Sequence, residues 1–241
     1  MNRRVLVTRP EPGAARTATR LAALGFEPVL LPLTETRALP VAVDAVPNNA
    51  VAVTITSANA LRHAPKELVA ALAHLPCHAV GKRTADAARM AGFVSVREGP
   101  GDAQGLADTL AGQMARPLAG KALVYLCGRV RLATFEQRLQ AAAIHVFPVE
   151  TYDTLAVERE SAVIVASLSD WPVDNVLLYS AKAAEAVLAV ARRPELAHLF
   201  GRSTFLCLSG RVATALAFVD GERIRVSPEP NEEALLGLLP A

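Results

Sequence analysis

Turns that place a hydroxyl or a glycine beside a cation or an amide recur along the chain, each directly after a short apolar run. In open α/β sheets, ligands bind at the carboxyl ends of the strands, where the next helix begins with free backbone N–H groups. These groups carry partial positive charge and bind carboxylates or phosphates. The candidate binding residues in these turns are Thr8, Arg9, Ser57, Asn59, Gly81, Lys82, Arg83, Thr84, Gly128, Arg129, Ser180, Ala181, Lys182, Gly210 and Arg211.

Any one of these turns has a simpler explanation, because Ser and Thr are favoured caps at the start of a helix. Taken together, the turns favour a cleft for a ligand that carries several carboxylates. The net charge of the chain is only +2, so attraction for such a ligand must come from local clusters. Aromatic residues make up 5% of the chain, which argues against a nucleic-acid partner held by base stacking.

Several well-known catalytic patterns are missing from the sequence. No glycine-rich dinucleotide fingerprint follows the first apolar run, and no P-loop motif is present. The five histidines lack the spacing of metal ligands, so we interpret them as structural or surface residues. No nucleophile elbow with a Ser-His-Asp or Cys-His arrangement is visible. We therefore expect no metal and no cofactor, and an enzyme of this kind would act mainly by positioning its substrate.

The elements that must hold these turns alternate between strand and helix, as is typical of parallel sheets covered by helices. The pattern predicts a strand over 4–8, a helix over 14–24 that ends at Gly25, and a strand over 27–31. Together they form a βαβ unit, in which two neighbouring strands run parallel.

The same order of elements is predicted a second time. A second copy of the first strand is predicted over 122–126. A helix over 134–143 and a strand over 145–149 follow it. Two further strand–turn–helix segments also have counterparts, and the ordered matches indicate two similar domains. The matching segments are 4–8 with 122–126, 51–57 with 176–180, and 78–85 with 207–213.

The sequence thus predicts an α/β protein with two similar doubly wound parallel-sheet domains joined by a two-stranded antiparallel linker. Segments 34–38 and 148–154 are β-prone and Thr-rich, and we expect them to form the linker ladder. The chain would then cross between the domains twice. Domain 1 would be discontinuous, with residues 1–33 and 155–241, and domain 2 would span residues 39–147.

The three cysteines, Cys77, Cys127 and Cys207, lie in or beside apolar runs and form no C-x-x-C pair. We interpret them as buried thiols of a protein from a reducing compartment. The first residues lack the apolar region of a signal peptide, and no apolar run reaches the length of a membrane span. We expect a soluble, cytoplasmic protein with no membrane partner, and a monomer is the simplest arrangement.

The order and spacing of the motifs resembles the uroporphyrinogen-III synthase family over essentially the whole chain. Each motif is short and of low specificity, whereas their order is much more specific. Ser209 and Val212 depart from the residues common in that family, so the last turn is the weakest candidate. The matching segments read VLVTRPEPGAARTATRLAALG, TITSANAL, AVGKRTADAARMAG, LVYLCGRVRLATFEQRLQAAAIHVFPVETYDT, LLYSAKAAEAV and LSGRVATAL.

The resemblance implies a substrate and a reaction. The substrate would be hydroxymethylbilane, a linear tetrapyrrole with eight carboxylates, closed into uroporphyrinogen III with loss of water and inversion of the last pyrrole ring. Tyr152 matches a tyrosine thought to assist the loss of hydroxide. A phenol with an ordinary pKa near roughly 10 is protonated at neutral pH and can donate a proton. The alternative role of Tyr152 is a cross-strand aromatic that shields the linker ladder.

Two rival functions stay open at this point. A two-domain binding or sensor protein for a polycarboxylate ligand would use the same linkers as a hinge and would need no proton donor. A sugar- or nucleotide-using transferase would show a metal-binding pair of carboxylates after a strand, and Asp102 and Asp108 do not form one. A protein with either rival function would not change which product forms from a tetrapyrrole.

Overall fold

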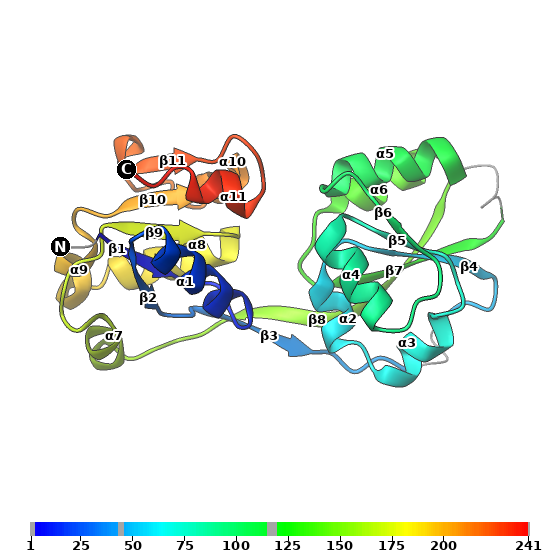
Figure 1. Cartoon of the computed structure of the whole chain (residues 1–241), viewed down its shortest axis with the longest axis horizontal. Helices are drawn as coiled ribbons and strands as arrows, with labels where there is room; N and C mark the ends of the chain where they lie inside the picture. The colour runs from blue at the N-terminus through cyan, green and yellow to red at the C-terminus, as the bar shows by residue number, and fades with distance from the viewer. Residues whose placement is uncertain (1–2, 43–45, 115–119, 241) are drawn as a thin grey trace. The chain divides into compact units, whose positions relative to one another are not determined.

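The computed structural model describes residues 3–42, 46–114 and 120–240 of the chain (Figure 1). It divides into two compact units, one made of Met1–Glu35 with Leu155–Ala241 and the other of Thr36–Thr154. Each unit contains one sheet of mainly parallel strands with helices on both faces, which confirms the predicted α/β class. That each unit is a domain in its own right stays a prediction.

The sheet of the first unit has the strand order β11-β10-β9-β1-β2, and every neighbouring pair is parallel. Its three central strands, β10, β9 and β1, are almost entirely buried on both faces, as is usual for parallel sheets. Alternate residues of a strand point to opposite faces, so Val5 and Val7 pack on one side and Leu6 on the other. The strands are β1 (Arg4–Val7), β2 (Glu27–Leu30), β9 (Asn175–Leu178), β10 (Thr204–Cys207) and β11 (Ile224–Val226).

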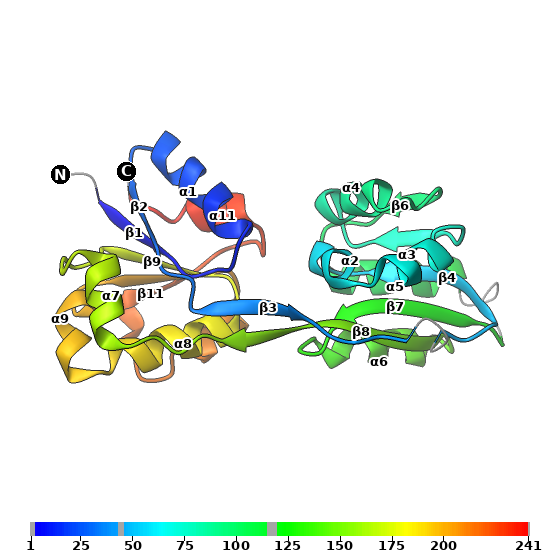
Figure 2. The same cartoon turned by 90° about the horizontal axis from the view of Figure 1, so that it is seen from below.

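Two layers of helices cover this sheet, as Figure 2 shows. The layer that contains α1 (Gly13–Ala23) and α11 (Glu232–Leu236) packs on the face of Val5 and Val7. The opposite layer packs on the face of Leu6. That layer consists of α7 (Ser161–Leu168), α8 (Ala181–Ala191), α9 (Ala197–Phe200) and α10 (Gly210–Thr214), with short 3-10 turns at Pro194–Leu196 and Gly221–Arg223.

The sheet of the second unit has the order β3-β8-β7-β4-β5-β6. One face carries α2 (Ala58–His63), α3 (Lys66–Leu72) and α4 (Lys82–Met90), and the other carries α5 (Ala103–Met114) and α6 (Ala133–Ala141). The strands are β3 (Thr34–Ala38), β4 (Ala50–Ile55), β5 (Cys77–Ala79), β6 (Val96–Glu98), β7 (Ala122–Gly128) and β8 (His145–Ala156).

The two sheets share one topology, which confirms the order of the predicted duplication. Read from β11, the first sheet runs β11-β10-β9-β1-β2, and read from β6, the second runs β6-β5-β4-β7-β8. Thus β1 corresponds to β7, β9 to β4, and β10 to β5, as the matched segments predicted. The chain enters the two copies at different strands, because β1 and β2 of the first unit precede the entire second unit.

One predicted boundary is wrong. The segments 145–149 and 148–154 were expected as a domain strand and a separate linker strand, but they form the single 12-residue strand β8. Pro148 does not interrupt it, because proline is tolerated where a strand has no neighbour on its N–H side. Here β8 pairs with β7 at Pro148, whereas β3 joins it only from Thr151 onward.

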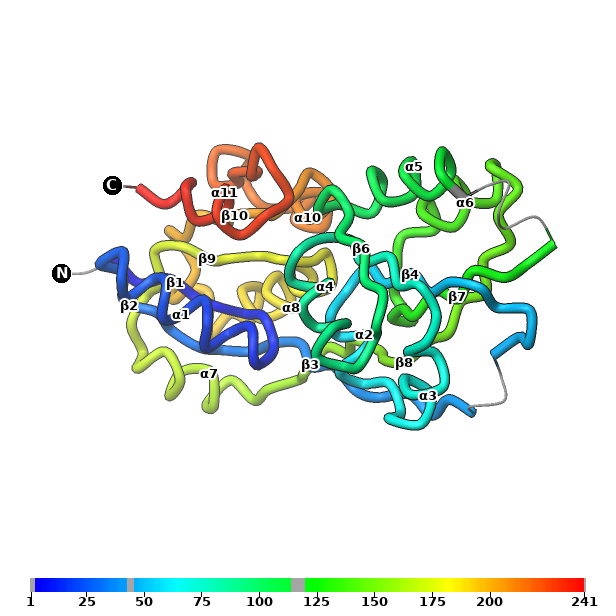
Figure 3. Tube along the Cα trace, turned by 45° about the vertical axis from the view of Figure 1, so that its right-hand side comes forward, coloured from blue at the N-terminus to red at the C-terminus, as the bar shows by residue number. Residues whose placement is uncertain are grey.

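The pairing of β3 with β8 is antiparallel. The Leu39 N–H donates to the Thr151 carbonyl at 2.9 Å, and the Val157 N–H donates to the Leu33 carbonyl at 2.9 Å. The partner residue therefore moves backward along β8 as β3 advances, the pattern expected of the predicted ladder. Figure 2 and Figure 3 show the two segments side by side.

The three cysteines are free and buried, as predicted, and burial raises the pKa of each thiol to about 12. These thiols are therefore protonated and unreactive at neutral pH. Within the parts of the chain that the structure describes, no helix combines the length and the apolar character needed to cross a membrane.

Candidate active site

The carboxyl edge of each sheet has a point at which the strand order reverses, and ligands of doubly wound folds bind at such points. In the first unit the reversal lies between β1 and β9, which end before Thr8 and Tyr179. In the second unit it lies between β4 and β7, which end before Thr56 and at Gly128. Predicted site residues therefore flank both reversal points.

Tyr152 lies directly over Gly128 in the second unit. The two residues are register partners in the β7–β8 pair. A Cβ atom added to Gly128 would lie 2.7 Å from Cζ of Tyr152 and 3.0 Å from its hydroxyl oxygen. Only glycine leaves room for the phenol at this position, so the backbone of Gly128 forms the surface on which the ring rests.

Two further side chains surround the Tyr152 ring. Ser57 hydrogen-bonds its hydroxyl. The ring of His63 stacks on the phenol with centroids 5.8 Å apart and an interplanar angle of 29°. His63 is held in turn by Thr36 of β3, whose Oγ1 lies 2.8 Å from Nε2 of the imidazole. The phenol is thus fixed by β7, β8 and α2 of the same unit.

The surroundings of the Tyr152 phenol keep it protonated. Burial raises the pKa of Tyr152, and the hydrogen bond with Ser57 partly offsets this rise. The phenol therefore carries its proton at neutral pH and can donate a hydrogen bond.

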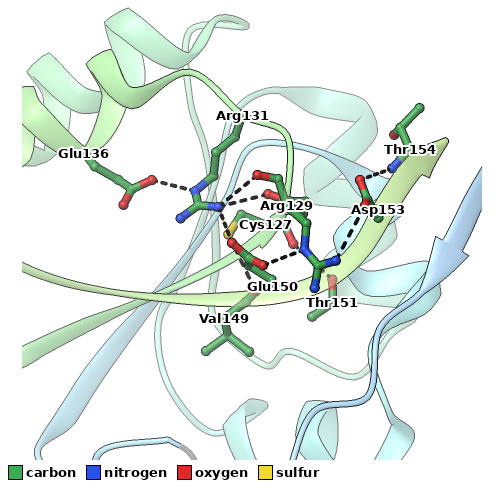
Figure 4. A network of polar contacts seen from close by, with 10 residues as sticks. Cys127, Arg129, Arg131, Glu136, Val149, Glu150, Thr151, Asp153 and Thr154 are labelled. Atoms are coloured by element: carbon green, nitrogen blue, oxygen red, sulfur yellow. Dashed lines mark hydrogen bonds and ion pairs between the residues drawn. The ribbon is translucent and has the colours of Figure 1, made fainter. Parts of the chain in front are cut away.

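The turn after β7 carries a network of ion pairs, drawn in Figure 4. The guanidinium of Arg131 contacts Glu136 at 2.6 Å and Glu150 at 2.8 Å. Arg129 contacts Glu150 at 3.2 Å and Asp153 at 3.7 Å, yet 56% of its side chain is exposed. Of the two cations, Arg129 is the more exposed, since only 20% of the Arg131 side chain is exposed.

A surface pocket of about 420 Å³ opens beside this network. It lies at the start of α6, and its walls combine cationic, anionic and amide groups. The lining residues are Arg129, Arg131, Ala133, Glu136, Gln137 and Gln140.

The reversal point of the first unit is occupied by a carboxylate of the chain itself. Glu232 of α11 accepts hydrogen bonds from Arg9 at 3.0 Å, from Thr17 at 2.5 Å and from Tyr179 at 2.7 Å. Arg20 reaches its second oxygen at 3.1 Å. The positive charge of Arg9, which was expected to meet a substrate carboxylate, is therefore already paired with Glu232 of the same unit.

The hydroxyls of the other candidate residues serve the fold. The side chain of Thr8 is fully buried and donates to the Leu177 carbonyl at 3.0 Å, which ties β1 to β9. Ser57 accepts from the Asn59 N–H at 3.3 Å and Ser180 from the Ala183 N–H at 3.1 Å, so both cap helices. The simpler capping explanation holds for both serines. Ala181 and Lys182 follow in the first turn of α8.

The remaining candidates lie at the ends of β5 and β10, farther from the reversal points. Gly81 is the N-cap residue that precedes α4, and the buried Thr84 lies in the first turn of that helix. Their neighbours Lys82 and Arg83 are exposed, as are the α10 residues Gly210 and Arg211. The structure thus brings Ser57, Gly128 and Tyr152 into contact and places the other turns elsewhere along the two sheet edges.

Several side chains of the site were not predicted. His63, Glu150 and Glu232 gave no sequence signal, because their roles depend on partners that only the folded chain brings close. Tyr179 also belongs to this group, because its hydroxyl joins the Glu232 cluster. In the described ranges, no three His, Cys, Asp or Glu side chains lie close enough together to hold a metal ion.

Comparison with known proteins identifies what this chain resembles. Residues 15–237 match the family model of uroporphyrinogen-III synthase HemD. A uroporphyrinogen-III synthetase from Helicobacter pylori has the same fold, with a TM-score of 0.62 and 18% identity over 99% of this chain and 98% of that one. A mutant uroporphyrinogen III synthase from Thermus thermophilus gives a TM-score of 0.52 and 19% identity over 98% and 96%. No curated protein matches.

Proposed function

Because the chain belongs to the uroporphyrinogen-III synthase family, we propose that it converts hydroxymethylbilane into uroporphyrinogen III, a step of haem biosynthesis. The substrate loses hydroxide from the hydroxymethyl carbon of its first ring, while its own pyrrole nitrogen supplies the electrons. The last ring attacks at its substituted carbon to form a spiro intermediate, which fragments and recloses with that ring inverted. The net loss of water makes the enzyme a carbon–oxygen hydro-lyase.

The protein has two tasks in this reaction, and Tyr152 is our candidate for the first. Hydroxide leaves more readily when it receives a proton or a hydrogen bond as the carbon–oxygen bond breaks. The phenol of Tyr152 is hydrogen-bonded to Ser57 and protonated at neutral pH, so it has a proton to offer the substrate. This arrangement over Gly128 is the observation that carries the assignment. One positioned acid of this kind contributes about 10²- to 10⁴-fold to a rate.

The second task is to hold the substrate in the conformation that closes by the inverted route. Carboxylates bind well at cations and at free N–H groups of helix starts. We propose that the exposed Arg129, Lys82 and Arg211, with the N–H groups after β4, β5, β9 and β10, bind the substrate side chains. The remaining proposed contacts are Arg9, Ser57, Asn59, Gly81, Arg83, Ser180, Ala181, Lys182 and Gly210. The buried Thr8, Thr84 and Gly128 would support the binding turns from beneath.

The decisive experiment supplies the purified protein with freshly generated hydroxymethylbilane and resolves the isomers of the product after oxidation. Uncatalysed closure yields the symmetric type I isomer, so formation of type III at a rate proportional to protein concentration is the expected result. Heat-denatured protein is the control and should give type I alone. If the native protein also gives type I alone, the chain is a binding protein for the polycarboxylate and no cyclase.

A further inference from the structure

Arg131 connects four groups around the turn that follows β7. Its Nη1 donates to the Gly128 carbonyl at 3.3 Å and to the Arg129 carbonyl at 3.2 Å. The same nitrogen contacts Glu150 at 2.8 Å, and Nε contacts Glu136 at 2.6 Å. One guanidinium therefore joins the turn to β8 through Glu150 and to α6 through Glu136 (Figure 4).

The same turn is also hydrogen-bonded to the residue that carries the phenol. The Arg129 N–H donates to the Tyr152 carbonyl at 2.8 Å, and the Arg129 side chain reaches Glu150 at 3.2 Å. Glu150 thus contacts the guanidinium groups of both Arg129 and Arg131. Because strand β8 carries both Glu150 and Tyr152, any shift of the turn relative to β8 changes what lies beneath the phenol.

The tolerance of that contact is small. Gly128 approaches the Tyr152 ring so closely that a single added carbon would overlap it. A guanidinium is a planar fork that can bind several acceptors at once in a fixed geometry. Arg131 is mostly buried, with 20% of its side chain exposed, so its hydrogen bonds compete little with water.

We propose that Arg131 is a positioning residue for Tyr152, which it serves by locking Gly128 and the turn after β7 against β8. The inference rests on the proposed function, in which the Tyr152 phenol assists hydroxide loss. Although Arg131 also lines the surface pocket, the role proposed for it is exerted through Gly128 and the turn. The pKa of its partner Glu150 is lowered, chiefly by the hydrogen bond with Arg131, so this carboxylate is ionised at neutral pH.

The test compares Arg131→Met and Arg131→Lys with the wild-type chain in the hydroxymethylbilane assay. Loss of the fork should lower kcat about 10- to 100-fold with KM changed less than about 3-fold, since misplacement of a catalytic group by about 1 Å can cost 10²-fold. Lysine keeps the charge but cannot bind all four acceptors. The kcat of Arg131→Lys should therefore lie between those of the wild-type chain and Arg131→Met. Arg138→Met is the matched control, because it removes an α6 arginine that contacts Asp108 at 2.6 Å on the exposed surface.

A second readout follows the phenol directly and does not depend on turnover. The chain has three tyrosines, so a protein labelled with ¹³Cζ-tyrosine gives few signals, and Tyr152→Phe assigns the one of interest. In Arg131→Met the Tyr152 signal should shift at neutral pH while the signal of Tyr179, which belongs to the other unit, stays in place. Tyr125 is no reference, because the charge of Arg131 acts on it as well. A purely structural arginine would lower the melting temperature without moving this signal in the folded protein.

The outcomes separate the two proposals. Wild-type kcat and an unmoved Tyr152 signal in folded Arg131→Met would overturn the positioning role. If Arg131→Met does not fold, Glu150→Gln removes the ionic partner on β8, and an unmoved signal together with wild-type kcat in that variant would overturn it equally. If wild-type protein forms no type III isomer, the proposed function fails, whereas the position of the phenol signal still reports whether Arg131 fixes Tyr152.

Discussion

The two units each hold a half-buried tyrosine near the carboxyl edge of the sheet, and the partners of the two phenols differ. Tyr179 of the first unit donates its proton to Glu232 at 2.7 Å, and Arg9 lies over its ring at 4.1 Å. Tyr152 of the second unit is hydrogen-bonded to the Ser57 hydroxyl and stacks on His63. Burial raises the pKa of both phenols, that of Tyr179 to about 12.

Burial alone therefore does not make a phenol a proton donor. The proton of Tyr179 is already shared with a carboxylate, whereas the O–H of Tyr152 has no anionic partner among its described contacts. The neighbouring carboxylate decides which of the two protons is available. The cations of the two units both contact carboxylates and differ in exposure, since 17% of the Arg9 side chain is exposed against 56% of the Arg129 side chain.

The sharpest test of this comparison removes each hydroxyl in turn. Tyr152→Phe should lower kcat by about 10²- to 10⁴-fold, with a smaller change in KM, because the phenol acts while the carbon–oxygen bond breaks. Tyr179→Phe should change kcat by less than about 3-fold and act mainly on stability. Steady-state kinetics of both variants on hydroxymethylbilane measure this. Equal losses in the two variants would show that the partner of the phenol does not decide its role.

A smaller effect is expected when the phenol stays and its support changes. In Gly128→Ala the new Cβ would lie 2.7 Å from Cζ of Tyr152, so the ring must move. Because the ring is the far end of a side chain, we expect a modest loss of about 1 kcal/mol in unfolding free energy. The loss in kcat should be larger, about 10- to 100-fold.

Gly112→Ala is the control for this substitution. Gly112 lies inside α5, and a Cβ there meets nothing within 4 Å. Alanine in a helix interior should stabilise the protein by roughly 0.5–1 kcal/mol and leave kcat unchanged. A Gly128→Ala variant with wild-type kcat would mean that the phenol needs no close support, which would contradict the proposed role of the site.

These residues also show how far the sequence could predict the molecule. The duplicated order of strands and helices was predictable, since apolar runs and turn residues recur locally in both copies. The continuity of β8 was not predictable. Pro148 can lie inside a strand only because β3 is not paired with β8 at that position, and the sequence does not reveal this. Tyr152 was found by resemblance, and its contact with Gly128 required the pairing of β7 with β8.

The available charge at the sheet edges was the least predictable property. Arg9 was expected to meet a substrate carboxylate, but Glu232, far away in the sequence, already binds it. Nothing local to Arg9 or Glu232 indicates this pair, because packing of α11 against α1 brings them together. Whether Arg9 contacts the substrate stays a prediction, which the next substitution tests.

Glu232→Gln removes the anion of the first unit and keeps the shape of the side chain. We expect it to lower the unfolding free energy by about 1–2 kcal/mol, since hydrogen bonds to charged groups contribute about 1.5–3 kcal/mol and Glu232 is partly solvent-screened. If the freed Arg9 contacts the substrate, KM should fall about 2- to 5-fold while kcat stays within about 2-fold. Denaturant unfolding and steady-state kinetics measure both. An unchanged unfolding free energy in Glu232→Gln would show that the ionic cluster around Glu232 does not stabilise the fold.

The smallest effect is the pH dependence of this stabilisation, and its sign is fixed by the pKa of Glu232. Burial by itself raises that pKa, but hydrogen bonds from Thr17 and Tyr179 and the charges of Arg9 and Arg20 lower it below its ordinary value. A carboxyl group with a lowered pKa in the folded state stabilises the fold above its unfolded pKa and loses this contribution as the pH falls through its folded pKa. The difference in unfolding free energy between the wild-type chain and Glu232→Gln should therefore be constant near neutral pH and shrink below about pH 4. If this difference instead grows on acidification, the anionic form of Glu232 is destabilised in the folded protein. The contrast between Tyr179, bonded to a carboxylate, and Tyr152, bonded to a hydroxyl, would then have no electrostatic basis.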